Sequence, residues 1–318
     1  MNCGRVFSCQ NAKRPLPMKH PPITLTTALL LTLPPMLWAG NAVIGRLIAP
    51  AVSPMTLNLL RWSLAFVLLL PLAAPVLRPG SLLWQSWKRF LGLSMLAIGG
   101  YNALLYLALN TSTPINVTLV GSITPVWMLL VGRIFFGYRI SRLQWLGACL
   151  SISGVMLVLS RGQLEVLLQV RLVAGDLYIL LASAFWAFYS WMLAHPTTEP
   201  VEIRRNWSAF LLAQVAFGLG WSGLFAGTEW ALGLGRFDFT WPLALALLFI
   251  ATGPALLAYR AWGAGVSRAG PSVAGFFANL TPLFTAVMSG LFLGEPPRPY
   301  HALAFVLIVG GIVVSSRR

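Results

Sequence analysis

The chain has 318 residues, of which 58% are hydrophobic and only 9% are charged. A mean hydropathy of +0.78 excludes a soluble protein of this length, which would need a polar exterior. The net charge of +15 does not indicate nucleic-acid binding, because the basic residues lie mostly in short loops between apolar stretches. The composition therefore predicts an all-α integral membrane protein embedded in a lipid bilayer.

Residues 1–23 form a basic tail that we expect to be cytoplasmic, and the sequence leaves open whether translation starts at Met1 or Met18. No small-residue cleavage site follows the first apolar stretch, so we expect that stretch to be retained as a helix. Ten apolar spans follow, joined by connections so short that neighbouring helices must be antiparallel. Their expected limits are 24–47, 56–75, 90–109, 115–135, 143–159, 174–194, 207–226, 241–263, 271–292 and 300–315.

The distribution of Lys and Arg predicts the orientation of these spans. With the N-terminus inside, 15 of the 22 basic residues fall in cytoplasmic segments and five fall in outside segments. Short cytoplasmic loops carry an excess of Lys and Arg, so both termini are expected in the cytoplasm. The protein is then a multi-pass protein of the cell (inner or plasma) membrane.

A repeat appears when residues 114–154 are placed on 271–311 with a constant offset of 157. Eight of the 41 positions are identical, and four of these are Pro or Gly, which fix backbone shape. Pro125 and Pro282 are one such pair, and each is expected to kink its helix. Five spans per copy is an odd number, so the second copy is inverted around a central cavity, as in secondary transporters. We expect the first repeat over 24–160, a linker over 161–173 and the second repeat over 174–318.

Four stretches resemble the EamA-type transporters of the drug/metabolite transporter superfamily: "LWAGNAVIGRLIA" at 37–49, "NLLRWSLAFVLLLPL" at 58–72, "GDLYILLASAFWAFYSWM" at 175–192 and "NLTPLFTAVMSGLFLGEPPRPYHALAFVLIVGGIVVSS" at 279–316. The resemblance covers nearly the whole chain from residue 24. It implies ten helices in two inverted halves and movement of small metabolites, often amino acids or related compounds, outward through a cavity. The family's Gly-Glu pair after the fourth helix is present as Gly294-Glu295 but is Gly137-Tyr138 in the first half.

Polar and aromatic side chains deep in the spans are the candidates for contact with a solute, because they are costly in a membrane. Several share a helix face at a spacing of three or four residues. Interfacial aromatic belts and helix–helix contacts are the structural alternatives. The candidates are Trp38, Asn41, Asn102, Tyr106, Trp186, Tyr189, Tyr259, Arg260, Trp262 and Asn279.

Three arginines, Arg46, Arg61 and Arg260, lie within or near the ends of spans. Snorkelling to the membrane surface is the simpler interpretation for all three. Recognition of a substrate carboxylate is the alternative, for which Arg260 is preferred because it adjoins Tyr259.

All seven acidic residues map to loops or helix ends, and no span contains an acid or a histidine at mid-membrane depth. A proton relay through a buried carboxylate is therefore not indicated, and Asp176 is expected to cap a helix. No catalytic motif or metal-ligand spacing is present, so an intramembrane enzyme, a cofactor and a metal site are all disfavoured. We expect a secondary transporter that exports a small-molecule substrate by alternating access. A noncatalytic membrane scaffold or receptor is the alternative, and the sequence does not decide the oligomeric state.

Overall fold

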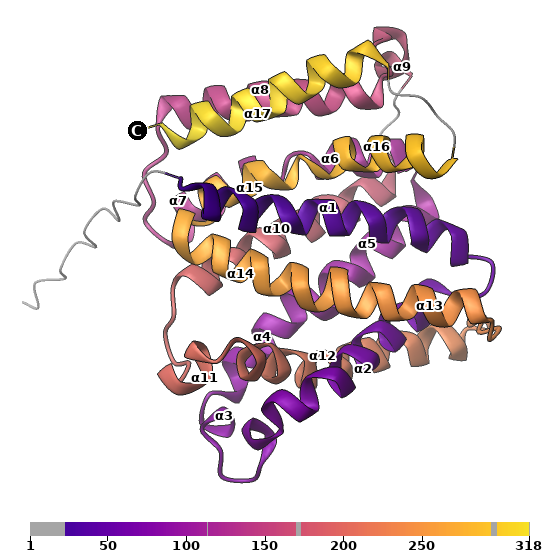
Figure 1. Ribbon diagram of the computed structural model, residues 1–318, viewed down its shortest axis with the longest axis vertical. Coiled ribbons are helices and arrows are strands. Elements are labelled where there is room, and N and C mark those ends of the chain that lie inside the picture. Colours follow the sequence, from indigo (N-terminus) through magenta and orange to yellow (C-terminus); the bar gives the residue numbers. More distant parts are fainter. Residues whose placement is uncertain (1–22, 113, 170–172, 294–297, 318) are drawn as a thin grey trace, which may run out of the picture.

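A computed structural model describes residues 23–112, 114–169, 173–293 and 298–317. Of the expected basic tail at 1–23, residues 1–22 therefore lie outside the described residues. Nearly all described residues are helical, and one isolated β-bridge joins Val52 to Phe237. The long helices run side by side in one bundle (Figure 1). This arrangement confirms the all-α fold class.

The segments before residue 170 follow the order of the expected spans. They are α1 (Leu25–Ile48), α2 (Pro54–Ala73), the 3₁₀ turn η1 (Ala74–Leu77), α3 (Leu82–Gln85), α4 (Trp87–Ser94), the π-helical η2 (Met95–Gly99), α5 (Gly100–Thr111), α6 (Pro114–Gly121), α7 (Thr124–Phe135), α8 (Arg142–Leu159) and α9 (Leu164–Leu168).

The segments after residue 173 repeat much of this order. They are α10 (Ala174–Ala194), α11 (Val201–Arg205), α12 (Trp207–Ala231), α13 (Trp241–Ile250), the π-helical η3 (Ala251–Leu257), α14 (Ala258–Ala269), α15 (Pro271–Ala278), α16 (Thr281–Leu293) and α17 (Pro299–Ser316). Asp176 caps α10 as expected, since its Oδ2 accepts a hydrogen bond from the Val173 N–H at 2.9 Å.

Nine helices within the described residues are long and apolar enough to cross a membrane. The stretch from α4 through η2 to α5, which the sequence analysis counts as a further span, is helical throughout but is not one of the nine. It begins with the charged Lys88 and Arg89 next to Trp87. The multi-pass membrane architecture is therefore established, and the count of ten spans stays a prediction.

The offset of 157 holds for whole structural elements. Adding it to the bounds of α6 gives those of α15, and adding it to the bounds of α8 gives those of α17. It also moves η2 to 252–256, inside η3. Because π-helical turns are rare, a matched pair supports a common backbone plan for the two halves.

The fourth span of each half is broken in two, and this corrects the expectation of proline kinks. Two residues separate α6 from α7, and two separate α15 from α16. Pro125 is the second residue of α7 and Pro282 the second residue of α16. A proline in the first turn of a helix removes no intrahelical hydrogen bond, so neither residue distorts a helix from within.

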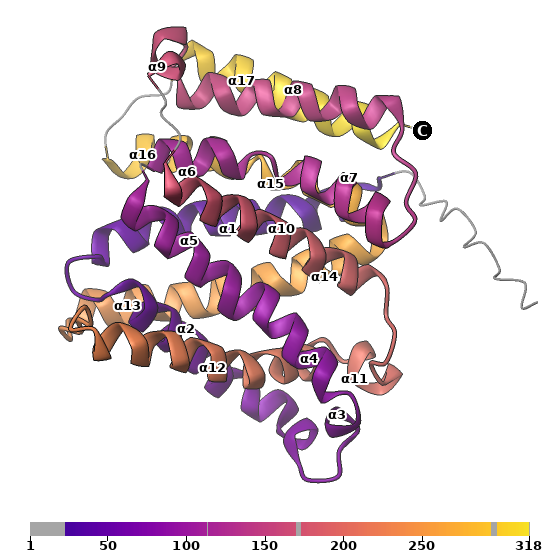
Figure 2. The ribbon, with the colours of Figure 1, turned by 180° about the vertical axis from the view of Figure 1, so that it is seen from behind.

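The last helices of the two halves, α8 and α17, lie against each other along one edge of the bundle (Figures 1 and 2). A Cβ atom added at Gly311 would lie 2.6 Å from the carbonyl oxygen of Gly147, and one added at Gly154 would lie 2.9 Å from that of Ala304. These two contacts are equivalent under the offset of 157. Small residues thus allow close backbone approach at a symmetric interface.

Candidate functional site

A cluster of aromatic side chains occupies the centre of the bundle, and we call it the aromatic cluster. Trp186 on α10 is its centre, with ring centroids 5.2 Å from Trp38, 5.4 Å from Trp262 and 5.7 Å from Tyr259. These distances are typical of favourable aromatic pairs. The full set of members comes from α1, α2, α5, α10 and α14: Trp38, Trp62, Tyr101, Trp186, Tyr189, Tyr259 and Trp262.

The polar atoms of the aromatic cluster bond mainly to backbone and hydroxyl groups. Trp38 Nε1 donates to the Pro254 carbonyl at 3.3 Å, and the Tyr259 hydroxyl donates to the Ala97 carbonyl at 3.0 Å. Trp262 Nε1 donates to the Ser190 hydroxyl at 3.1 Å. These bonds fix the orientation of the rings, because a buried indole or phenol needs a partner.

Both π-helical segments face the aromatic cluster through equivalent carbonyl groups. Ala97 lies in η2 and Pro254 in η3, and their numbers differ by 157. The Ala97 carbonyl also accepts a hydrogen bond from Asn102 Nδ2 at 3.2 Å. Such segments often occur at functional sites, where their carbonyl groups are available to side chains. This placement links the irregular backbone of each half to the same central cluster.

The structure brings together five of the residues selected from the sequence: Trp38, Trp186, Tyr189, Tyr259 and Trp262. Asn102 is buried and adjoins them through the Ala97 carbonyl. Asn41 is half-buried on the turn after Trp38 and has no hydrogen-bond partner among the described residues. The side chain of Tyr106 lies outside the described part of the chain.

Asn279 lies away from these rings and connects the two halves. Its Nδ2 donates to the carbonyl of Ser122 at 3.2 Å and to the hydroxyl of Ser151 at 2.9 Å. Ser122 occupies the position equivalent to Asn279 in the first half, between α6 and α7. The helix–helix role that the sequence analysis left open for Asn279 is therefore the one these contacts support.

Arg260 and Arg61 differ in burial: the exposed Arg260 fits the simpler interpretation of snorkelling, and the buried Arg61 does not. Arg260 is exposed and its guanidinium lies over the ring of Trp207, 4.3 Å from the centroid, so it does not join its neighbour Tyr259 in the cluster. Arg61 does not snorkel: it is 6% exposed, and its Nη2 donates to Asn102 Oδ1 at 3.3 Å. The expectation was wrong for Arg61 because a single sequence shows depth along a helix and not which face meets another helix. The side chain of Arg46 lies outside the described residues.

Sequence reasoning also missed Trp62, Tyr101 and Asn58. Asn58 and Trp62 are four residues apart on α2, the same spacing that selected other candidates, so a signal was present. Asn58 Nδ2 donates to the Ile98 carbonyl at 3.3 Å and to the Ser222 hydroxyl at 3.0 Å. The π-helical segments themselves have no comparable sequence signature.

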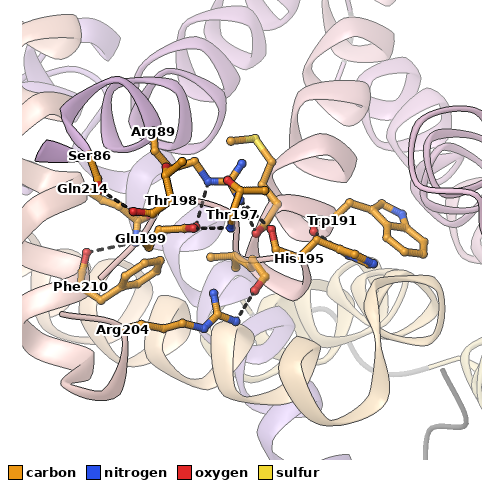
Figure 3. A network of polar contacts seen from close by, with 12 residues as sticks. Ser86, Arg89, Trp191, His195, Thr197, Thr198, Glu199, Arg204, Phe210 and Gln214 are labelled. Carbon is orange, nitrogen blue, oxygen red and sulfur yellow. Dashed lines mark hydrogen bonds and ion pairs between the residues drawn. The ribbon is translucent and has the colours of Figure 1, made fainter. Parts of the chain in front are cut away.

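A polar network joins α4 to the segment between α10 and α11 at one end of the bundle (Figure 3). Arg89 Nε pairs with Glu199 Oε1 at 2.9 Å, and its Nη2 donates to the carbonyls of Met192 and His195. Burial raises the pKa of Glu199, but hydrogen bonds from Arg89 and the Thr197 N–H outweigh it and leave the pKa below its ordinary value. The carboxylate therefore stays charged and joins α4 to the segment between α10 and α11.

Comparisons with known proteins agree with this architecture. The model of the EamA-like transporter family matches residues 25–160 and 173–317. An uncharacterized transporter of Archaeoglobus fulgidus is 26% identical, over 92% of this chain and 98% of its own. The aromatic amino acid exporter YddG of Ancylobacter novellus is 23% identical, over 73% and 76%. A crystal structure that is 21% identical shares the fold with a TM-score of 0.69, over 91% of this chain and 96% of that one.

Proposed function

Because the chain belongs to the EamA-like transporter family and is a membrane transporter of small metabolites, we propose that it exports amino acids or related compounds by alternating access. The observation that carries this proposal is the aromatic cluster, which contains Trp38 and Trp62 from the first half and Trp186 and Trp262 from the second. A midplane site at the junction of two repeats is where secondary transporters bind their solutes.

The contacts within the aromatic cluster favour a solute with an apolar or aromatic part. In the described conformation Trp186 is 5% exposed and Trp262 is fully buried, and the rings pack against one another. A solute would replace these ring–ring contacts with its own as the two halves move apart. The similarity to an aromatic amino acid exporter supports the same class of solute.

The proposal includes a location and an orientation. We place the protein in the cell (inner or plasma) membrane with both termini in the cytoplasm, since that orientation puts most Lys and Arg inside. It follows that Arg89 and Glu199 hold the cytoplasmic end and Glu229 the outer end. Reporter fusions at the two termini test this: activity of a periplasm-dependent reporter at either end would contradict it. We propose no catalytic step.

Export itself is tested by profiling the medium of cells that overproduce the wild type, a Trp186→Ala variant or no transporter. We expect amino acids or related compounds to accumulate outside with the wild type and to fall by about tenfold or more with Trp186→Ala, since a truncated central ring loses its contacts. Trp241→Ala is the matched control, because Trp241 is 76% exposed. All proteins are compared at equal membrane levels. An identical medium for the wild type and the empty control would refute export and leave an importer, an exchanger that lacks its counter-solute, or a scaffold.

A further inference from the structure

Arg61 is a buried cation with few partners. It is the eighth residue of α2 and is 6% exposed. Its Nη2 makes one long hydrogen bond, 3.3 Å to Asn102 Oδ1, and its Nε has no partner among the described residues. The guanidinium lies 5.0 Å from the ring centroid of its neighbour Trp62. A membrane protein rarely tolerates such a charge without a function.

No carboxylate neutralises Arg61 within the described part of the chain. The one ion pair found there joins Arg89 to Glu199. Glu229 bonds to the first turn of α2, and Asp176 bonds to Ser112 and Val173. Burying a cation is costly unless an anion and further hydrogen bonds compensate it. None of the described carboxylates therefore supplies the anion that would compensate the buried charge of Arg61.

Two more unsatisfied polar atoms lie on the same face of α2. Trp62 Nε1 is a buried donor without a partner, and Asn58 Oδ1 is a buried acceptor without a partner. Asn58, Arg61 and Trp62 are three and four residues apart, which places them on one helix face. Unsatisfied buried groups of this kind are few in native proteins and need an explanation. Donors and an acceptor at one place match a ligand that carries both an anionic and a cationic group.

This group borders the aromatic cluster. The Trp62 ring lies 5.0 Å from Tyr259, and Tyr259 shares the Ala97 carbonyl with Asn102, the partner of Arg61. A chain of direct contacts thus runs from the guanidinium to the rings around Trp186. One solute could reach both regions.

We propose that Arg61 binds the carboxylate of the transported solute, with Asn58 Oδ1 facing its amino group and the aromatic cluster holding its side chain. This inference rests on the proposed function and names its solute class: amino acids with one carboxylate and an apolar or aromatic side chain. The planar guanidinium fork suits a carboxylate. A phosphate dianion would need further cations, and Arg61 is the one Lys or Arg that is buried among the described residues.

The test uses purified protein in liposomes and two probes that differ only in the carboxylate: L-phenylalanine and L-phenylalanine amide. We expect Arg61→Gln to lower the transport of L-phenylalanine by about 30-fold or more, because the buried charge pair with the solute is lost. Transport of the amide should stay within about threefold of the wild type. Arg61→Lys should recover part of the L-phenylalanine transport. Arg260→Gln is the matched control and should leave both probes unchanged.

The outcomes distinguish a failure of the proposed carboxylate binding by Arg61, which we call the carboxylate anchor, from a failure of the proposed transport function. Wild-type rates of L-phenylalanine transport in Arg61→Gln would overturn the carboxylate anchor and leave the proposed function standing. Equal loss of both probes would also overturn it, since a structural role affects both alike. Thermal unfolding in detergent checks this point, because a structural arginine would lower the midpoint on replacement and a substrate anchor would not. A wild type that carries neither probe would refute the proposed solute class, and the anchor with it.

Discussion

The helical stretch α4–η2–α5 of the first half and the stretch α13–η3–α14 of the second half share a backbone plan but differ in side chains. Each contains a π-helical segment, and each segment turns an equivalent carbonyl, that of Ala97 or Pro254, toward an aromatic donor. Asn102 and Tyr259 hold equivalent positions five residues later, and both donate to Ala97. The comparison shows that one backbone plan, used twice, supports an asymmetric site.

The second spans differ in the same way. Arg61 is the eighth residue of α2, and Gln214 is the eighth residue of α12. Both are buried and both keep an unsatisfied polar atom, but only Arg61 carries a charge. The buried charge at this position therefore occurs in the first half alone. Two halves with the same backbone plan can thus offer a charged side chain from one half and an uncharged side chain from the other.

Substitutions in the interface between α8 and α17 test the symmetry of the two halves most directly. We expect Gly154→Val and Gly311→Val each to lower the free energy of unfolding by about 3 kcal/mol, because the added side chain meets backbone atoms of the other helix. Gly310→Val is the control, since a Cβ there meets nothing within 4 Å. Unfolding in detergent with increasing SDS measures the three variants. Very different losses at Gly154 and Gly311 would contradict the symmetric interface.

Polar contacts join the two halves at both ends of the bundle, and the interacting groups differ between the ends. Arg89 of the first half bonds to Glu199 and two carbonyls of the second. Glu229 of the second half accepts hydrogen bonds from the backbone N–H groups of Met55 and Thr56 at the start of α2.

We expect Arg89→Met to lower the free energy of unfolding by about 2 kcal/mol, because it removes the ion pair with Glu199 and the donor of two carbonyls, and leaves Glu199 only backbone donors such as the Thr197 N–H. Glu229→Gln should cost about 1 kcal/mol, since the amide keeps part of the cap and loses the charge at the helix N-terminus. The same SDS unfolding experiment compares them. A larger loss for Glu229→Gln would reverse this ranking of the two ends.

The smallest expected effect is a dependence of the protein's stability on pH, which arises from Glu199 at one end of the bundle. The folded protein holds the pKa of Glu199 below its ordinary value, so its contribution to stability is present above the unfolded pKa of about 4.3. That contribution is lost as the pH falls through the lower, folded pKa. Between pH 5 and pH 3 the wild type should therefore lose more stability than Glu199→Gln. Parallel pH curves for the two proteins would show that Glu199 makes no such contribution.

Much of the site was predictable from local sequence. Trp38, Trp186, Tyr189, Tyr259 and Trp262 were all identified, because large amphipathic rings deep in a span must pack against something. Trp62 and Asn58 followed the same spacing rule and were overlooked. Arg260 was a poorer choice than Arg61, because the turn of about 100° from Tyr259 to the next residue takes Arg260 to the exposed side of α14.

The sequence by itself determined the membrane class and the repeat at an offset of 157, because hydrophobicity, Gly and Pro act locally on the backbone. The tertiary structure decided which helix faces meet, and therefore which polar atoms are buried. It moved Arg61 from the membrane surface to the centre and turned the expected proline kinks into helix breaks. It also placed two π-helical segments against one aromatic cluster. The contacts of the two π-helical segments join residues more than 150 positions apart, and the contact of Arg61 with Asn102 joins two different helices, so local sequence carries no record of them.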